Sequence, residues 1–184
     1  MNIANKVSTF RILTVPFFIA CLLYYSADKD YLRFIALFIF ILAVFSDAVD
    51  GYIARIKKEH SPAGLILDPL ADKIILLSAF IFLHLVDTGI KFPLWVTLIV
   101  VSRDAIILLG IVSIFMVRQK LNISPTMWGK LTTSFQMASV LSILMRLWFS
   151  YLIWSVAIIF TLISGFDYIK KGFGVLYGSG GNSK

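Results

Sequence analysis

The chain has few of the residues that build disulfide-stabilised domains or bind soft metals. Its 184 residues include a single cysteine, Cys21, and two histidines, His60 and His84. One cysteine excludes an intramolecular disulfide and a CxxC-type zinc site. Cys21 lies in an apolar run, where a small buried hydrophobic residue is the usual role. The sequence therefore does not indicate the redox compartment.

Charged residues are also scarce. They make up 15% of the chain, whereas hydrophobic residues make up 59% and the mean hydropathy is +0.90. A formal net charge of +7 alone would suit a nucleic-acid-binding protein. Six long apolar runs and 16 phenylalanines instead indicate an all-α integral membrane protein. We expect one domain over residues 1–171 and a flexible, Gly- and Ser-rich tail over residues 172–184.

The six apolar runs are long enough, or nearly so, to cross a hydrocarbon core of about 30 Å. We therefore predict six transmembrane helices, over residues 7–25, 32–54, 65–86, 92–117, 128–149 and 151–169. With the N-terminus in the cytoplasm, eleven basic residues lie on or near the cytoplasmic side. Only four lie on the opposite side, namely Lys29, Arg33, Lys91 and Arg146. The positive-inside rule thus predicts that both termini are cytoplasmic.

Four aspartates interrupt the apolar runs. Asp47 and Asp50 lie near the end of the second predicted helix, and Asp68 and Asp72 lie near the start of the third. Carboxylates inside a membrane are costly and usually functional. At about 100° per residue, the two members of each pair share one stripe of their helix. Each pair therefore forms a small acidic surface.

The two acidic surfaces are predicted to meet. Only eight residues separate Arg55 from Gly64, a length that suits a tight connection between antiparallel helices. Both pairs then lie at the cytoplasmic face. Ligands that are all oxygen favour hard cations such as Mg²⁺ or Mn²⁺, and the lack of a nearby cysteine, with His60 alone in the loop, argues against zinc or copper. Arg55 adds a bidentate donor for phosphate.

Together these residues form the pattern Asp47-x2-Asp50-Gly51-x2-Ala54-Arg55-x8-Gly64-x3-Asp68-x3-Asp72. The pattern resembles the signature of the CDP-alcohol phosphatidyltransferases at all eight specified positions. The resemblance implies a six-helix membrane enzyme, which transfers a phosphatidyl group from CDP-diacylglycerol to an alcohol and releases CMP.

The resemblance also implies roles for individual residues. Two divalent ions, Mg²⁺ or Mn²⁺, would be held by Asp47, Asp50, Asp68 and Asp72. Asp72 would also be the general base. The CDP moiety would contact Asp47, Gly51, Ala54 and Arg55. A homodimer is the implied assembly, and the bacterial inner membrane is the expected location, with the active site on the cytoplasmic side that the charge distribution predicts.

Three basic residues are candidates to bind the acceptor alcohol, namely Lys73, Arg103 and Lys130. Each has a plain alternative. Arg103 lies near the middle of the fourth predicted helix, where a structural ion pair with an aspartate is the alternative. Lys73 could instead pair with a carboxylate or extend towards the membrane interface, and Lys130 could also extend towards the interface. Thr133 and Gln136 share a helix face and either line the same cavity or bond to a neighbouring helix.

The identity of the acceptor stays open at this point. The lead-in Asn2-Ile3-Ala4-Asn5-x2-Ser8-x2-Arg11 and the chain length resemble bacterial phosphatidylglycerolphosphate synthases, which implies glycerol 3-phosphate. The segment Ser102-Arg103-Asp104 is closer to cardiolipin synthases, which use phosphatidylglycerol. An ion-coupled transporter is the non-enzymatic alternative, since buried carboxylates also mark ion routes. A transporter would release no CMP with any acceptor.

Overall fold

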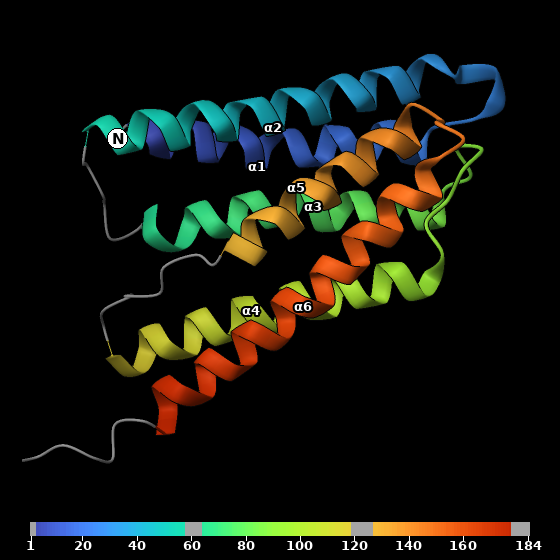
Figure 1. The fold of residues 1–184 in the computed structure, drawn as a ribbon. Coiled ribbons are helices and arrows are strands. Elements are labelled where there is room, and N and C mark those ends of the chain that lie inside the picture. Colours follow the sequence, from blue (N-terminus) through green and yellow to red (C-terminus); the bar gives the residue numbers. More distant parts are fainter. Residues whose placement is uncertain (1–2, 58–63, 119–126, 178–184) are drawn as a thin grey trace, which may run out of the picture.

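The computed structural model describes the backbone of residues 3–57, 64–118 and 127–177, and the side chains of residues 11–46, 73–110, 127–168 and 170. This part of the chain contains six α-helices and no β-strand (Figure 1). The elements are α1 (Ile3–Leu23), the 3₁₀ helix η1 (Ala27–Lys29), α2 (Tyr31–Lys57), α3 (Gly64–Leu85), α4 (Leu94–Arg118), α5 (Met127–Leu144) and α6 (Ser150–Tyr177). The prediction of six helices is therefore confirmed.

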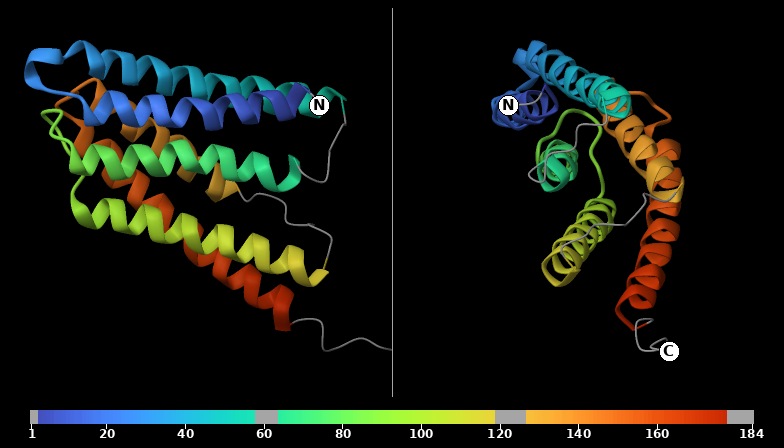
Figure 2. Two further views of the ribbon diagram at one scale, coloured as in Figure 1. Left: turned by 180° about the vertical axis from the view of Figure 1, so that it is seen from behind. Right: turned by 90° about the vertical axis from the view of Figure 1, so that its left-hand side faces the viewer.

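Consecutive helices run in opposite directions. The starts of α1, α3 and α5 and the ends of α2, α4 and α6 lie at one end of the bundle, which we call the inner end (Figure 1). The short connections around η1, between α3 and α4 and between α5 and α6 form the opposite, outer end. In the end-on view of Figure 2, α3 and α4 face α5 and α6, while α1 and α2 pack together beside them.

The buried core is apolar and rich in phenylalanine. Phe80 of α3 stacks on Phe92, which precedes α4, with ring centroids 4.3 Å apart. Phe18 of α1 contacts Phe40 of α2 at 5.9 Å. All four rings are almost fully buried. Aromatic contacts of this kind add to the gain from burying the rings; one pair holds α1 against α2, and the other holds α3 against the start of α4.

The fifth helix is shorter than predicted. We expected it to continue to residue 149, but α5 ends at Leu144. Arg146 has a left-handed φ of +54°, its amide donates to Ile143 O at 2.9 Å, and the amide of Leu147 donates to Ser142 O at 2.9 Å. This pair of bonds is a Schellman motif, in which a left-handed residue ends the helix and satisfies its last carbonyls. A hydropathy pattern cannot detect such an end, because apolar residues continue beyond it.

Arg146 also ties the three outer loops together. Its Nε donates to Thr88 O at 2.6 Å, in the connection between α3 and α4. Its guanidinium forms an ion pair with Asp30 at 2.9 Å and a hydrogen bond with Tyr25, both in the connection between α1 and α2. A hydrogen bond from Arg33 is the main reason that the pKa of Asp30 lies below its ordinary value. The carboxylate is thus held in its charged form.

The outer surfaces of the helices are strongly apolar. Phe17, Phe38, Phe45, Leu109 and Phe166 are each at least 60% exposed. Within the described side chains, one segment, Ser150–Tyr168 of α6, is long and apolar enough to cross a membrane. Three shorter apolar segments lie in the other helices, Arg11–Leu23, Tyr31–Ser46 and Lys73–Leu85.

Candidate active site

The two acidic pairs lie on helices that meet the inner end of the bundle. Asp47 and Asp50 are in the last part of α2, and Asp68 and Asp72 are in the first part of α3. Those two stretches are antiparallel and reach the same end, as the spacing predicted (Figure 1).

The side chains of this stretch lie outside the described ones, so their roles stay predictions. The affected residues are Asp47, Asp50, Gly51, Ala54, Arg55, Asp68 and Asp72. Among the described side chains, no group of three His, Cys, Asp or Glu could hold a metal ion.

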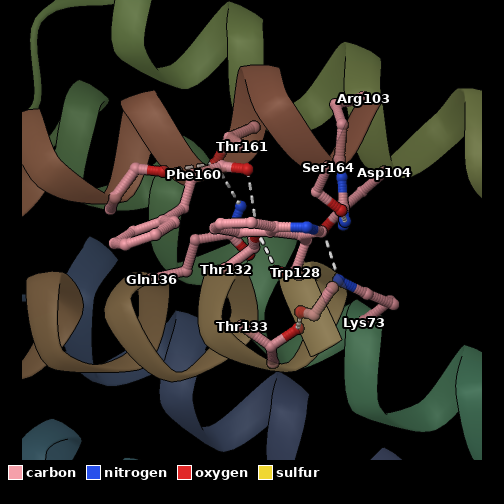
Figure 3. A network of polar contacts seen from close by, with 12 residues as sticks. Lys73, Arg103, Asp104, Trp128, Thr132, Thr133, Gln136, Phe160, Thr161 and Ser164 are labelled. Carbon is pink, nitrogen blue, oxygen red and sulfur yellow. Dashed lines mark hydrogen bonds and ion pairs between the residues drawn. The ribbon is translucent and has the colours of Figure 1, made fainter. Parts of the chain in front are cut away.

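A buried charged cluster begins at the next residue of α3. Lys73 Nζ lies 2.9 Å from Asp104 Oδ2 of α4. Arg103 Nη1 lies 2.6 Å from the other carboxylate oxygen, Oδ1. Arg103 Nη2 also donates to the hydroxyl of Ser164 on α6. These four residues, which we call the Asp104 cluster, join three helices (Figure 3).

Burial makes the Asp104 cluster unusual. The side chain of Asp104 is fully inaccessible, and those of Arg103 and Lys73 are 9% and 15% exposed. A charge taken out of water is very costly unless it is paired and hydrogen-bonded. Asp104 satisfies this condition with one cation on each oxygen, and the pairing leaves one positive charge in excess. By formal charge, the described cluster is therefore basic.

The cluster shows the alternative contacts that the sequence offered for Arg103 and Lys73, and acceptor binding by either residue stays a prediction. Arg103 forms an ion pair with an aspartate, and Lys73 turns into the bundle towards the same carboxylate. Asp104 was not among the predicted site residues, although a carboxylate in the middle of an apolar helix was a usable signal. Lys130, in the first turn of α5, is exposed and has no ion pair among the described residues. The described structure thus brings together two of the three acceptor candidates.

A polar seam between α5 and α6 lies beside the cluster (Figure 3). Gln136 is fully buried and donates to Thr161 Oγ1 at 3.1 Å. Thr132 Oγ1 donates to Phe160 O at 2.9 Å. Thr133 instead bonds within its own helix, to Gly129 O at 3.1 Å. Gln136 and Thr132 therefore each link α5 to α6, whereas Thr133 does not.

An open groove of about 390 Å³ runs between α4 and α6 and is bordered by Arg103. Its lining is mostly apolar, with Leu98, Leu162 and Phe166 among the contributors. Two polar groups that border it, Arg103 Nε and the hydroxyl of Tyr168, are buried and have no hydrogen-bond partner within the described part of the chain. Buried donors normally have partners, so these two groups remain able to donate hydrogen bonds to an oxygen atom of a ligand in the groove.

Comparison with known proteins covers almost the entire chain. The family model described as CDP-alcohol phosphatidyltransferase matches residues 1–163. A protein of Aquifex aeolicus named CDP-diacylglycerol--glycerol-3-phosphate 3-phosphatidyltransferase is 28% identical, over 96% of this chain and 99% of that protein. A protein of Bacillus subtilis with the same name is 29% identical, over 95% and 97%. One of Haemophilus influenzae, also with that name, is 30% identical, over 79% and 76%.

Proposed function

Because the chain belongs to the CDP-alcohol phosphatidyltransferase family, we propose that it transfers the phosphatidyl group of CDP-diacylglycerol to glycerol 3-phosphate. The products are phosphatidylglycerol phosphate and CMP. The observation that carries the proposal is the complete acidic pattern, on stretches of α2 and α3 that lie at the same end of the bundle, in a chain whose relatives over nearly their full length are named for this reaction. The chain is thus a CDP-diacylglycerol-dependent phosphatidyltransferase.

The donor set fits a divalent metal centre. Four carboxylates at the joined ends of two helices, with no sulfur or imidazole among them, are oxygen ligands of the kind that Mg²⁺ and Mn²⁺ prefer. Asp47, Asp50, Asp68 and Asp72 would hold two ions. Ions bound there would neutralise the diphosphate and stabilise the attacking and leaving oxygens.

The protein residues account for the remaining steps. Gly51, Ala54 and Arg55, together with Asp47, bind the CDP moiety, with Arg55 donating to phosphate. Asp72 takes the proton from the acceptor hydroxyl as its oxygen attacks the phosphorus that carries diacylglycerol. A new P–O bond to the acceptor forms, the bond between that phosphorus and the oxygen bridging to the CMP phosphate breaks, and CMP leaves with the electron pair.

The acceptor phosphate binds near the Asp104 cluster in this proposal. Lys73 follows Asp72 directly, so the proposed base and the cluster are adjacent on α3. The excess positive charge and the unpartnered Arg103 Nε attract a phosphorylated acceptor. Lys130, exposed at the inner end, is the third proposed contact and would guide the acceptor inward.

One observation favours a second acceptor. The apolar groove between α4 and α6 borders Arg103 and could take an acyl chain, which glycerol 3-phosphate lacks. Phosphatidylglycerol as acceptor would make the protein a cardiolipin synthase. The names of the relatives favour glycerol 3-phosphate, so phosphatidylglycerol is the alternative.

We further propose that all six helices span a bacterial inner membrane as part of a homodimer, with the inner end cytoplasmic. Large exposed apolar side chains on the helices support a lipid environment, because soluble proteins rarely expose so many. The excess of basic residues near the inner end supports the orientation.

The deciding experiment gives the purified enzyme CDP-diacylglycerol with Mg²⁺ and either glycerol 3-phosphate or phosphatidylglycerol. CMP release is measured, and the lipid product is identified by mass spectrometry. We expect phosphatidylglycerol phosphate from glycerol 3-phosphate and no product after chelation of the metal. Cardiolipin as the sole product would overturn the choice of acceptor. Absence of CMP with both acceptors would overturn the enzymatic proposal.

A further inference from the structure

Asp104 is the least accessible charged residue whose contacts the structure describes, and both of its oxygens hold cations. Lys73 reaches it from α3, and Arg103 reaches it from the same helix, α4. Neither cation has another carboxylate among its described ion pairs. Among the described residues, Asp104 is therefore the carboxylate that holds both cations.

Arg103 and Lys73 keep N–H donors that the described contacts do not use. An arginine has five N–H donors and a lysine has three. Arg103 uses Nη1 on Asp104 and Nη2 on Ser164, whereas its Nε has no described partner. Lys73 has one described bond, to Asp104. Several donors thus remain in a cluster that has two basic side chains and one carboxylate, and donors of this kind recognise phosphate.

We propose that Asp104 is a positioning residue for the acceptor, which holds Arg103 and Lys73 where their remaining N–H groups bind its phosphate. The inference rests on the proposed function and deepens it. Without the carboxylate of Asp104, the side chains of Lys73 and Arg103 would repel each other and turn apart, since little water is present to screen their charges. Ser164 of α6 accepts a hydrogen bond from the other terminal nitrogen of the guanidinium and so fixes it from a second side.

The test compares Asp104→Asn with Asp104→Glu by initial-rate kinetics on each substrate. The amide keeps the size of the side chain, but it has one acceptor oxygen instead of two and no charge to hold the cations. We expect KM for glycerol 3-phosphate to rise by about tenfold or more, whereas KM for CDP-diacylglycerol stays within about twofold. Asp104→Glu retains the charge and should recover part of the loss. Asp87→Asn, which breaks an exposed ion pair with Lys91 at the outer end, is the matched control.

A merely structural role predicts a different result. If Asp104→Asn lowers kcat or the thermal midpoint but leaves KM for glycerol 3-phosphate unchanged or lower, the proposal is wrong. Should that variant fail to fold, Ser164→Ala removes only the second support of Arg103. It should raise the same KM by a smaller factor, and an unchanged KM would again contradict the proposal.

If the proposed function is wrong, the wild-type enzyme itself gives a different result from the one expected. A wild-type enzyme that uses phosphatidylglycerol instead of glycerol 3-phosphate would refute the proposed acceptor. The Asp104 variants would then have to raise KM for phosphatidylglycerol, whose phosphate is the shared recognition element. Titration calorimetry of the active acceptor, without CDP-diacylglycerol, measures the same loss of affinity independently of turnover.

Discussion

The carboxylate of Asp50 is a predicted metal ligand, and its replacement by the isosteric amide tests that role directly. Asp50→Asn removes a negative charge from the predicted metal centre while retaining the size of the side chain. Because the reaction depends on neutralising the diphosphate, we expect CMP release to fall by at least about 100-fold. The measurement is CMP release at saturating Mg²⁺.

Asp28→Asn serves as the control for Asp50→Asn. Asp28 is exposed in η1 at the outer end, far along the bundle from the acidic pairs, so its variant should retain wild-type turnover (Figure 1). Wild-type turnover by Asp50→Asn would remove Asp50 from the ligand set.

Arg146 combines an unfavourable backbone conformation with contacts that offset it. A left-handed conformation costs a non-glycine residue roughly 1–2 kcal/mol. Arg146→Ala keeps that cost and loses the contacts to Thr88, Tyr25 and Asp30. We expect it to lower the free energy of unfolding by about 1–3 kcal/mol.

Arg146→Gly separates the two contributions, because glycine loses the same contacts but adopts a positive φ freely. It should therefore be about 1 kcal/mol more stable than Arg146→Ala. Reversible unfolding in detergent measures both values. Equal stability of the two variants would show that the backbone conformation carries no cost here.

Asp104 illustrates why residue roles are harder to predict than helices. Its isolated charge is visible in the sequence, but its partners come from α3, 31 residues away, and from its own neighbour. Spacing along one helix cannot reveal a partner on another helix. The acidic pairs were easier to interpret, because their pattern lies within two consecutive helices.

At the scale of elements, hydropathy predicted where helices lie but not how they end. The start of α4 follows Pro93, whose carbonyl accepts from the amides of Val96 and Thr97 at 3.1 and 3.3 Å. The predicted start at residue 92 was therefore close. The end of α5 was missed by five residues, since the left-handed Arg146 has no compositional signature. α6 continues to Tyr177, beyond the predicted end at residue 169 and into the predicted tail.

The packing of α4 on α6 gives an element-scale prediction at Gly165. A Cβ at this position would lie 3.5 Å from Arg103 Cγ, an ordinary contact distance. Gly165→Ala should therefore bind the acceptor as the wild type does. Gly165→Leu should fill part of the groove, displace the Arg103 side chain and raise KM for the acceptor several-fold.

Steady-state kinetics of the two Gly165 variants provide the measurement, and a thermal unfolding scan shows whether each is folded. A folded Gly165→Leu with wild-type KM for both acceptors would mean that neither the groove nor the position of Arg103 affects acceptor binding.

For the whole molecule, the sequence predicted six antiparallel helices and the location of the acidic pairs on α2 and α3. The all-helical bundle is confirmed, and the family follows from the match over residues 1–163. Orientation in a membrane was predicted from charge alone and stays a prediction. No hydropathy pattern could specify which helices pack together, because every helix has apolar residues on several faces.

The predicted orientation in the membrane can be tested by cysteine labelling, because Cys21 is the single cysteine of the sequence. In a Cys21→Ser background, Lys29→Cys places a thiol at the outer end and Lys170→Cys places one at the inner end. With intact cells, we expect a membrane-impermeant maleimide to label Lys29→Cys and not Lys170→Cys. Both should react after permeabilisation. The reverse pattern in intact cells would invert the predicted topology.

The contacts of Arg146 hold the outer end of the bundle together, and this restricts how the helices can move relative to one another. Arg146 joins all three connections at one extremity, and Arg33 adds a bond to the last carbonyl of α5, Leu144 O, at that extremity. Helices fastened together at one extremity can separate only by pivoting about it, so their displacement grows with distance from the pivot. Any movement that leaves these contacts intact is then larger at the inner end, where α2 and α3 carry their aspartates, than at the outer end. Substrate entry and product exit would thus require no rearrangement of the fastened loops.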